Sequence, residues 1–207
     1  MSTQVAARPY DHVFDGQKHY RTLLQCTARP GTIGQLDDVL VDVPAQLNRA
    51  TALLALALFS GDSTFHLAQG EEPVLEFLRC ETFAKAVSAE QADFLICSGA
   101  GRLEDLYCAR TGSLTFPDLG STVVAQVAAV SPAPVPGGLR LTLTGPGIET
   151  ETVVFVLGAS TELFELLRER NAEFPLGIDT FLTCDSLSAG PCVLSLPRTT
   201  QVRWEQI

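Results

Sequence analysis

An almost uninterrupted apolar run, Ala50–Phe59, constrains the fold of this chain more than any other feature of the sequence. A helix that crosses a bilayer needs about 20 apolar residues, so this run is too short to span a membrane. We therefore interpret it as a buried element and expect no membrane association. The wider segment Pro44–Phe59 predicts a helix that is apolar on most sides and hence deeply buried.

The segments around this helix alternate between helix-like and strand-like patterns and become strand-rich toward the end of the chain. Such alternation predicts an α/β fold with a mixed β-sheet covered by helices in three α/β/α layers. We expect a single domain over residues 1–207, with 1–13 as a poorly ordered N-terminal tail. The patterns predict helices over 15–29, 71–80, 102–109 and 160–171, and strands over 64–67, 94–97, 122–130, 139–144, 152–157, 178–184, 192–196 and 199–204.

Composition narrows the classes of function. The formal net charge of −10 disfavours nucleic acid, whose phosphates the overall field of the protein would repel. The first ten residues lack the apolar segment of a secretory signal, which predicts a cytoplasmic protein. The six cysteines show no C-x-x-C pair, so we expect free thiols, mostly buried, rather than a disulfide or metal framework.

Familiar catalytic constellations are missing from the sequence. The three histidines lie in the first third of the chain and form no metal-ligand pair, and no G-x-S-x-G motif precedes a later histidine. Lys85 lacks the glycine-rich or strand-end setting of a Schiff-base lysine. We predict no catalytic residue, no metal site and no cofactor.

The turn Gly99-Ala100-Gly101 follows a predicted strand and precedes a predicted helix, where backbone N–H groups can hold a phosphate. The third glycine of a dinucleotide fingerprint is replaced by Glu104, an anion. A tight turn without a ligand is therefore the favoured interpretation.

Asp179 and Arg198 lie at the ends of predicted neighbouring strands and could form a forked ion pair. Pro197 ends its strand and presents Arg198, Thr199 and Thr200 as a polar cluster. The pair either holds two strands together, which we favour, or contacts a ligand or partner. The residues singled out for structural, interface or ligand contacts are Arg21, Arg29, Pro30, Gly31, Asp179, Arg198, Thr199 and Thr200.

Three strings of residues resemble a known family. The most specific combines Phe174–Asp179 (FPLGID), Leu182–Cys184 (LTC) and Pro197–Thr200 (PRTT); the second runs through Tyr20–Ile33 (YRTLLQCTARPGTI); the third is Leu141–Ile148 (LTLTGPGI). Together they resemble, in order and over nearly the whole chain, the PhnH family of the bacterial carbon–phosphorus lyase core complex.

This resemblance implies a fold similar to the large domain of type I pyridoxal-phosphate-dependent transferases, without the cofactor. It implies partnership with the family's PhnG, PhnI and PhnJ subunits, and we expect a homodimer. The system joins a phosphonate to the ribose of ATP with loss of adenine, forming α-D-ribose 1-methylphosphonate 5-triphosphate. No catalytic residue is carried over to this chain.

Two other functions stay open. One is an autonomous transferase or hydrolase that uses the Asp179 and Arg198 region. The other is a module that binds nucleotide or phosphonate through Arg21, Arg29 and Arg198, which the acidic overall charge makes less favourable for a triphosphate.

Overall fold

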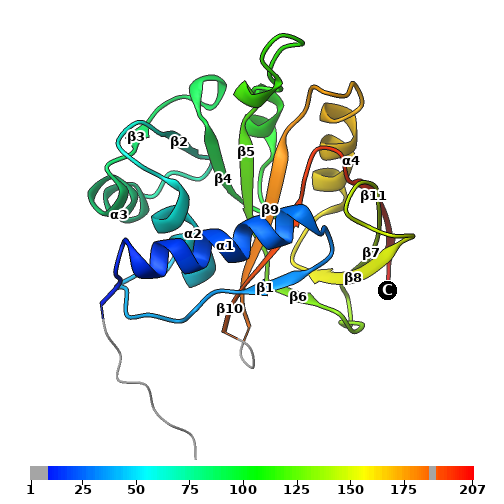
Figure 1. Cartoon of the computed structure of the whole chain (residues 1–207), viewed down its shortest axis with the longest axis horizontal. Coiled ribbons are helices and arrows are strands. Elements are labelled where there is room, and N and C mark those ends of the chain that lie inside the picture. Colours follow the sequence, from blue (N-terminus) through cyan, green and yellow to red (C-terminus); the bar gives the residue numbers. More distant parts are fainter. Residues whose placement is uncertain (1–8, 187–189) are drawn as a thin grey trace, which may run out of the picture.

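A mixed β-sheet forms the centre of the molecule (Figure 1). The computed structural model describes residues 9–186 and 190–207, and within them seven strands form this sheet in the order β1-β10-β9-β5-β4-β2-β3. The neighbours from β9 to β3 are parallel, whereas β10 and β1 are antiparallel to their neighbours. The strands are β1 (Ile33–Gln35), β2 (Thr64–Leu67), β3 (Lys85–Ala86), β4 (Phe94–Ser98), β5 (Thr122–Gln126), β9 (Asp179–Ser186) and β10 (Gly190–Leu196).

Three helices cover one face of this sheet: α1 (Phe14–Ala28), α2 (Arg49–Leu58) and α3 (Glu72–Thr82). Helix α2 contacts the sheet as well as α1 and α3, and α1 crosses in front of it in Figure 1. An element packed on several sides has no face left for water, which explains why the run that begins at Ala50 is apolar almost all round.

The other face of the central sheet packs against a second, antiparallel sheet and helix α4 (Thr161–Arg170). In the described residues this sheet has four strands in the order β11-β7-β8-β6. They are β6 (Ala129–Ser131), β7 (Leu139–Thr144), β8 (Thr152–Leu157) and β11 (Gln201–Gln206). The α/β class and the mixed sheet are confirmed, but four strands of the second half form a sheet of their own, so the layer on this face of the central sheet is not purely helical.

Side chains of the central strands alternate between the two cores. On β4, Leu95 packs toward the second sheet while Ile96 packs toward the helices, and both are fully buried. On β5, Val123 and Val124 divide in the same way. The central sheet therefore carries one hydrophobic core on each face, as expected for strands covered on both sides.

Two predicted elements were wrong in their details. The expected strand over 122–130 is divided, because the N–H of Val127 still bonds to Thr183 in the central sheet while the N–H of Ala128 bonds to Leu157 in the second. The chain changes sheets at this point. The expected helix over 102–109 is only a 3₁₀ turn, η2 (Glu104–Cys108), and its start has no side-chain cap.

Helix boundaries follow the capping residues. The predicted helix over 44–59 begins only at Arg49, because Asn48 caps it by accepting a hydrogen bond from the N–H of Thr51, and Pro44–Leu47 form a turn. The expected cap of α4 is confirmed, since the hydroxyl of Ser160 accepts from the N–H of Leu163. None of the helices described is long and apolar enough to cross a membrane.

Residues 9–13 lead into α1, and Pro9 forms a bridge with Leu40. The remainder of the expected N-terminal tail, residues 1–8, lies outside the described residues.

Candidate functional site

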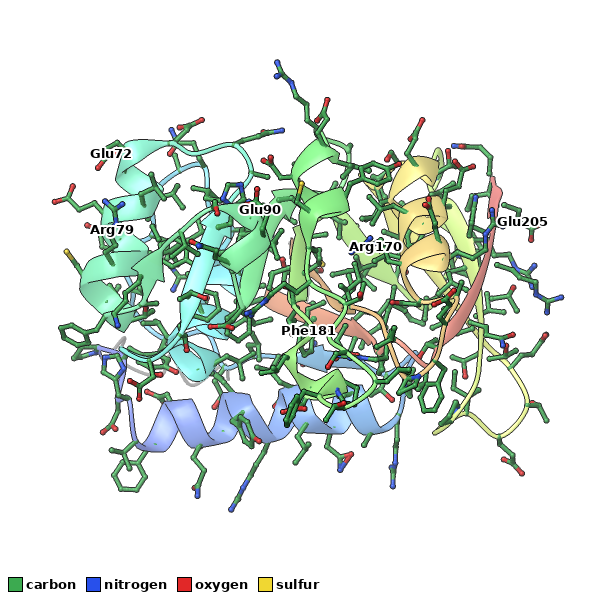
Figure 2. The ribbon with its side chains drawn as sticks, turned by 90° about the horizontal axis from the view of Figure 1, so that it is seen from above. Glu72, Arg79, Glu90, Arg170, Phe181 and Glu205 are labelled. Atoms are coloured by element: carbon green, nitrogen blue, oxygen red, sulfur yellow. The ribbon has the colours of Figure 1, made fainter. Side chains whose placement is uncertain are left out.

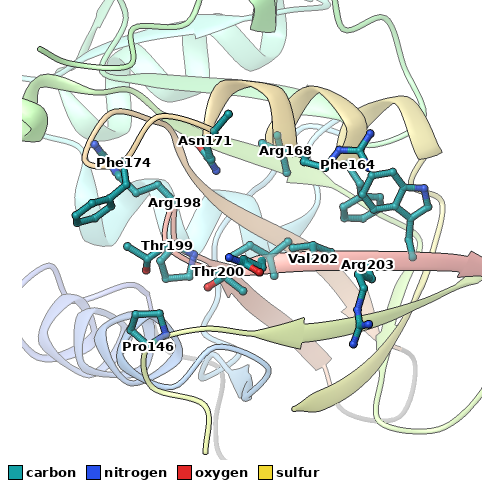
Figure 3. A pocket seen from close by; sticks show the side chains of 16 residues that line it. Pro146, Phe164, Arg168, Asn171, Phe174, Arg198, Thr199, Thr200, Val202 and Arg203 are labelled. Carbon is teal, nitrogen blue, oxygen red and sulfur yellow. The ribbon is translucent and has the colours of Figure 1, made fainter. Parts of the chain in front are cut away.

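A groove of about 840 Å³ lies between α4 and the segment that leads into β11 (Figure 3). The predicted cluster Arg198, Thr199 and Thr200 lies on its wall. The lining residues are Pro146, Phe164, Leu167, Arg168, Asn171, Ala172, Phe174, Leu196, Pro197, Arg198, Thr199, Thr200, Gln201, Val202, Arg203 and Trp204.

The expected forked ion pair lies at one end of this groove. The guanidinium of Arg198 donates to both carboxylate oxygens of Asp179, with Nη2 to Oδ2 at 2.7 Å and Nε to Oδ1 at 3.3 Å. The backbone N–H of Arg198 also donates to Oδ1 at 2.8 Å, and Nη1 donates to the carbonyl oxygen of Pro117 at 2.6 Å. All three guanidinium nitrogens are therefore held by this chain itself.

Close packing around Arg198 supports a structural role. Only 14% of its side chain is exposed. A Cβ added to Gly120 would lie 3.0 Å from Nη1, and one added to Gly177 would lie 3.0 Å from the Cβ of Arg198. The geometry thus fits the interpretation that the pair ties β9 to the start of β11 and to the loop at Pro117.

The wall formed by α4 and β11 is aromatic and cationic. The rings of Phe164 and Trp204 lie 5.9 Å apart, and the guanidinium carbon of Arg168 lies 5.0 Å from the centroid of Trp204. Such a cation–aromatic contact contributes roughly 0.5–1 kcal/mol at an exposed site. The sequence did hold a signal for this wall, because Phe164 and Arg168 are four residues apart on one helix and so share a face.

Thr199 and Thr200 belong to a tight turn, in which the N–H of Thr200 bonds to the carbonyl oxygen of Pro197 at 2.8 Å. Thr200 is buried, and its hydroxyl has no hydrogen-bond partner among the described residues. The turn carries the chain from β10 in the central sheet to β11 in the second sheet.

Pro30 and Gly31 lie at a different place, against the turn between β7 and β8. Gly31 has a φ of +94°, and a Cβ there would lie 2.5 Å from Cγ2 of Thr152. A Cβ on Gly147 would overlap the carbonyl oxygen of Ala28, and one on Gly145 would lie 2.7 Å from the carbonyl oxygen of Thr199. The three strings of residues that carry the family resemblance therefore meet at this turn, next to the groove.

Arg21 and Arg29 are not brought to the groove. Arg21 lies on α1 and Arg29 directly follows the last residue of this helix, and both are exposed. Of Arg21, Arg29 and Arg198, only Arg198 lines the groove.

The remaining sequence candidates have structural explanations. Crowding explains Gly99, since a Cβ there would lie 2.8 Å from Val127 and 3.0 Å from the carbonyl oxygen of Gly158, and one on Gly101 would lie 3.0 Å from the Cβ of Ser98. The five-residue turn that follows is too short to act as an anion-binding helix.

The cysteines are free thiols, as expected, although Cys80 and Cys108 are exposed rather than buried. Burial raises the pKa of Cys97 to about 12 and that of Cys184 to about 11. These thiols stay protonated at neutral pH and are poor nucleophiles. In the described part of the chain, no three His, Cys, Asp or Glu side chains come together as a metal site.

The fold is α/β, and its candidate site is a groove lined by Arg198, whose charge is paired with Asp179 of the same chain. The model of a family described as "Bacterial phosphonate metabolism protein (PhnH)" matches residues 9–203, and the chain belongs to this family. The resemblance inferred from the three strings is confirmed.

Two curated relatives agree. The chain is 31% identical over 198 residues to "Alpha-D-ribose 1-methylphosphonate 5-triphosphate synthase subunit PhnH" of Rhizobium meliloti (strain 1021), with 94% of each chain covered. It is 32% identical over 186 residues to "Putative C-P lyase subunit protein HtxG" of Stutzerimonas stutzeri, covering 90% of this chain and 85% of the relative.

Proposed function

We propose that this chain is a subunit of an α-D-ribose 1-methylphosphonate 5-triphosphate synthase within a carbon–phosphorus lyase system. The observation that carries the proposal is the match to the PhnH family over residues 9–203. The name of the Rhizobium relative, which aligns over 94% of its length, supplies the reaction.

The chain has no catalytic role on its own in this proposal. The charged groups of Asp179 and Arg198 beside the groove are already engaged in hydrogen bonds within this chain. A carboxylate and a guanidinium engaged in this way are not available as acid, base or anion clamp without breaking the fold locally. The chain therefore contributes structure to a site that other subunits complete.

Further parts of the proposal rest on the family resemblance. They are a fold similar to the large domain of type I pyridoxal-phosphate-dependent transferases without that cofactor, and a single domain over residues 1–207. They also include a homodimer, PhnG, PhnI and PhnJ as partners, and a cytoplasmic location. The mixed sheet between helical and strand-rich layers is compatible with such a fold.

A reconstitution experiment tests the subunit role. The purified chain is incubated with ATP and methylphosphonate alone and together with the other subunits from the same host, and adenine release is measured. We expect release only in the complete mixture. Robust adenine release by the isolated chain would overturn the proposal.

The second candidate is an autonomous transferase or hydrolase at the Asp179 and Arg198 region. The motivating observation is that Arg198 lines the groove and holds the carboxylate of Asp179 through its guanidinium. Asp179→Asn and Arg198→Ala distinguish the two roles. In a structural role, activity falls together with stability or assembly; in a catalytic role, turnover falls while the assembled complex forms normally.

A further inference from the structure

We propose that the groove beside β11 binds an extended, acidic segment of a partner polypeptide, which adds to the free edge of the four-stranded sheet as a further strand. This inference rests on the proposed function, because a subunit requires surfaces that other chains occupy. It goes beyond that function by naming the surface, the binding mode and the chemistry of the occupant.

The first observation is that β11 is an edge strand. Within the described residues it pairs with β7 on one side, and no backbone hydrogen bond outside that ladder involves Gln201–Gln206. Figure 1 places β11 at the margin of the molecule, next to the C-terminus. An edge strand presents a row of free N–H and C=O groups, which is the template for strand addition by another chain.

The second observation is that the groove follows this edge. Four consecutive residues, Gln201–Trp204, line the groove. Successive side chains of a strand point to opposite faces of the sheet. Four consecutive residues therefore border the same cavity only if the cavity lies along the edge of the strand. Figure 3 shows Val202 on the side of α4 and Arg203 pointing away from it.

The third observation is the character of the wall on the α4 side. Val202 and Trp204 present partly exposed apolar surface there, with the buried Phe164 and Leu167 behind them, and Phe174, with 73% of its surface exposed, also lines the groove. An added strand would place every second side chain against this surface. We therefore expect the occupant to carry apolar residues at alternate positions.

The positive charge of the groove favours an added strand that carries acidic residues. Its lining includes Arg168, Arg198 and Arg203 and no Asp or Glu, although the whole chain has a formal net charge of −10. Arg198 is neutralised by Asp179, whereas the ion-pair partner of Arg203 among the described residues is the exposed Glu151, at 3.6 Å. Arg168 and Arg203 thus remain to meet carboxylates, one on each face of an added strand.

The experiment uses the assembled complex and a photo-crosslinker, p-benzoylphenylalanine, in place of the exposed Gln201. We expect irradiation to link this position to a segment of another subunit that is rich in Asp and Glu and alternates with apolar residues. Amide hydrogen exchange over 201–206 should slow at least tenfold on assembly, because the free N–H groups gain partners.

A charge-reversal pair supplies the matched control. Arg168→Glu should weaken assembly about tenfold or more, since it removes an attractive charge and adds a repulsive one. Arg79→Glu changes the net charge equally at the opposite end of the molecule, where Figure 2 shows it on α3, and should leave assembly unchanged. Both variants are first checked for an unchanged far-UV circular dichroism spectrum and melting temperature.

The outcomes are distinguishable. If the complex assembles but neither crosslinking nor slower exchange occurs at β11, the docking inference is wrong and the subunit role stands. A crosslink to a second copy of this chain, or to a basic segment, also overturns it.

If ATP or methylphosphonate alone changes the fluorescence of Trp204, the only tryptophan, and Arg168→Glu abolishes that change, the groove is a small-molecule site instead. If no complex forms under any condition, the proposed function itself fails.

Discussion

At the scale of single residues, Arg198 illustrates how one side chain can hold several loops together. Its guanidinium donates to Asp179 on β9 and to the carbonyl oxygen of Pro117, and its backbone N–H also donates to Asp179. Breaking one partner of a largely buried pair costs more than the pair contributes, because the remaining charge loses its counterion.

Asp179→Asn should therefore lower the free energy of unfolding by about 2–3 kcal/mol, as expected for an uncompensated, mostly buried charge. Urea unfolding followed by Trp204 fluorescence measures the change. Glu205→Gln is the control, because it breaks the more exposed pair with Arg140 and should cost no more than about 1 kcal/mol. Equal losses in the two variants would contradict the structural role of Asp179.

His19 is a buried histidine whose pKa is lowered mainly by desolvation. The unfolded chain therefore binds this proton more tightly than the folded protein does. The free energy of unfolding is therefore unaffected by His19 protonation above the ordinary histidine pKa of about 6.5, and it decreases as the pH falls below that value.

His19→Gln should reduce the loss of stability between about pH 7 and pH 5, because glutamine cannot take up the proton. Thermal melting across this range measures the effect. Gln25→Ala is the control, since Gln25 is an exposed residue of the same helix without an ionisable side chain and its replacement should leave the slope unchanged. If the wild-type and His19→Gln slopes are identical, His19 is not the group responsible.

At the scale of elements, the turn between β7 and β8 joins the end of α1 to the turn before β11. Gly147 has a φ of +84° and a hydrogen in the place where a Cβ would overlap the carbonyl oxygen of Ala28. Gly137 has a similar φ of +75° but has nothing within 4 Å of its hypothetical Cβ.

These two glycines separate backbone strain from crowding. Gly137→Ala should cost about 1 kcal/mol, which is the usual penalty for alanine at positive φ. Gly147→Ala should cost at least about 2 kcal/mol more, because α1 or the turn must move. Chemical denaturation of both variants measures the difference, and equal costs would mean that α1 does not pack tightly on this turn.

The same elements show how far the sequence could be interpreted. Most strands and helices were predictable from periodicity and from caps such as Ser160, and the Asp179–Arg198 pair from its position at strand ends. The change of sheet at Val127–Ala128 was not, since both sides of it are equally apolar and only the partners differ. Strands β1 and β3 were missed because two or three residues carry no period.

The groove itself was only half predictable. Arg198, Thr199 and Thr200 were identified because Pro197 presents them, whereas Arg168 and Trp204 lie 36 residues apart in the sequence. Their contact depends on how α4 packs against β11, and that is a tertiary property which no local pattern encodes.

At the scale of the whole molecule, two cores share one sheet, and neighbouring residues on β4 serve different cores. Leu95→Ala and Ile96→Ala should each lower the free energy of unfolding by about 2–5 kcal/mol, the usual cost of a large cavity. If the chain is one cooperative domain, each change shifts the Trp204 signal near α4 and the far-UV helix signal to the same midpoint. The slope of free energy against denaturant should also stay constant, because the surface exposed on unfolding is the same. Two separate midpoints in the Ile96→Ala variant, with the helical signal lost first, would show that α1 to α3 unfold independently of the second sheet.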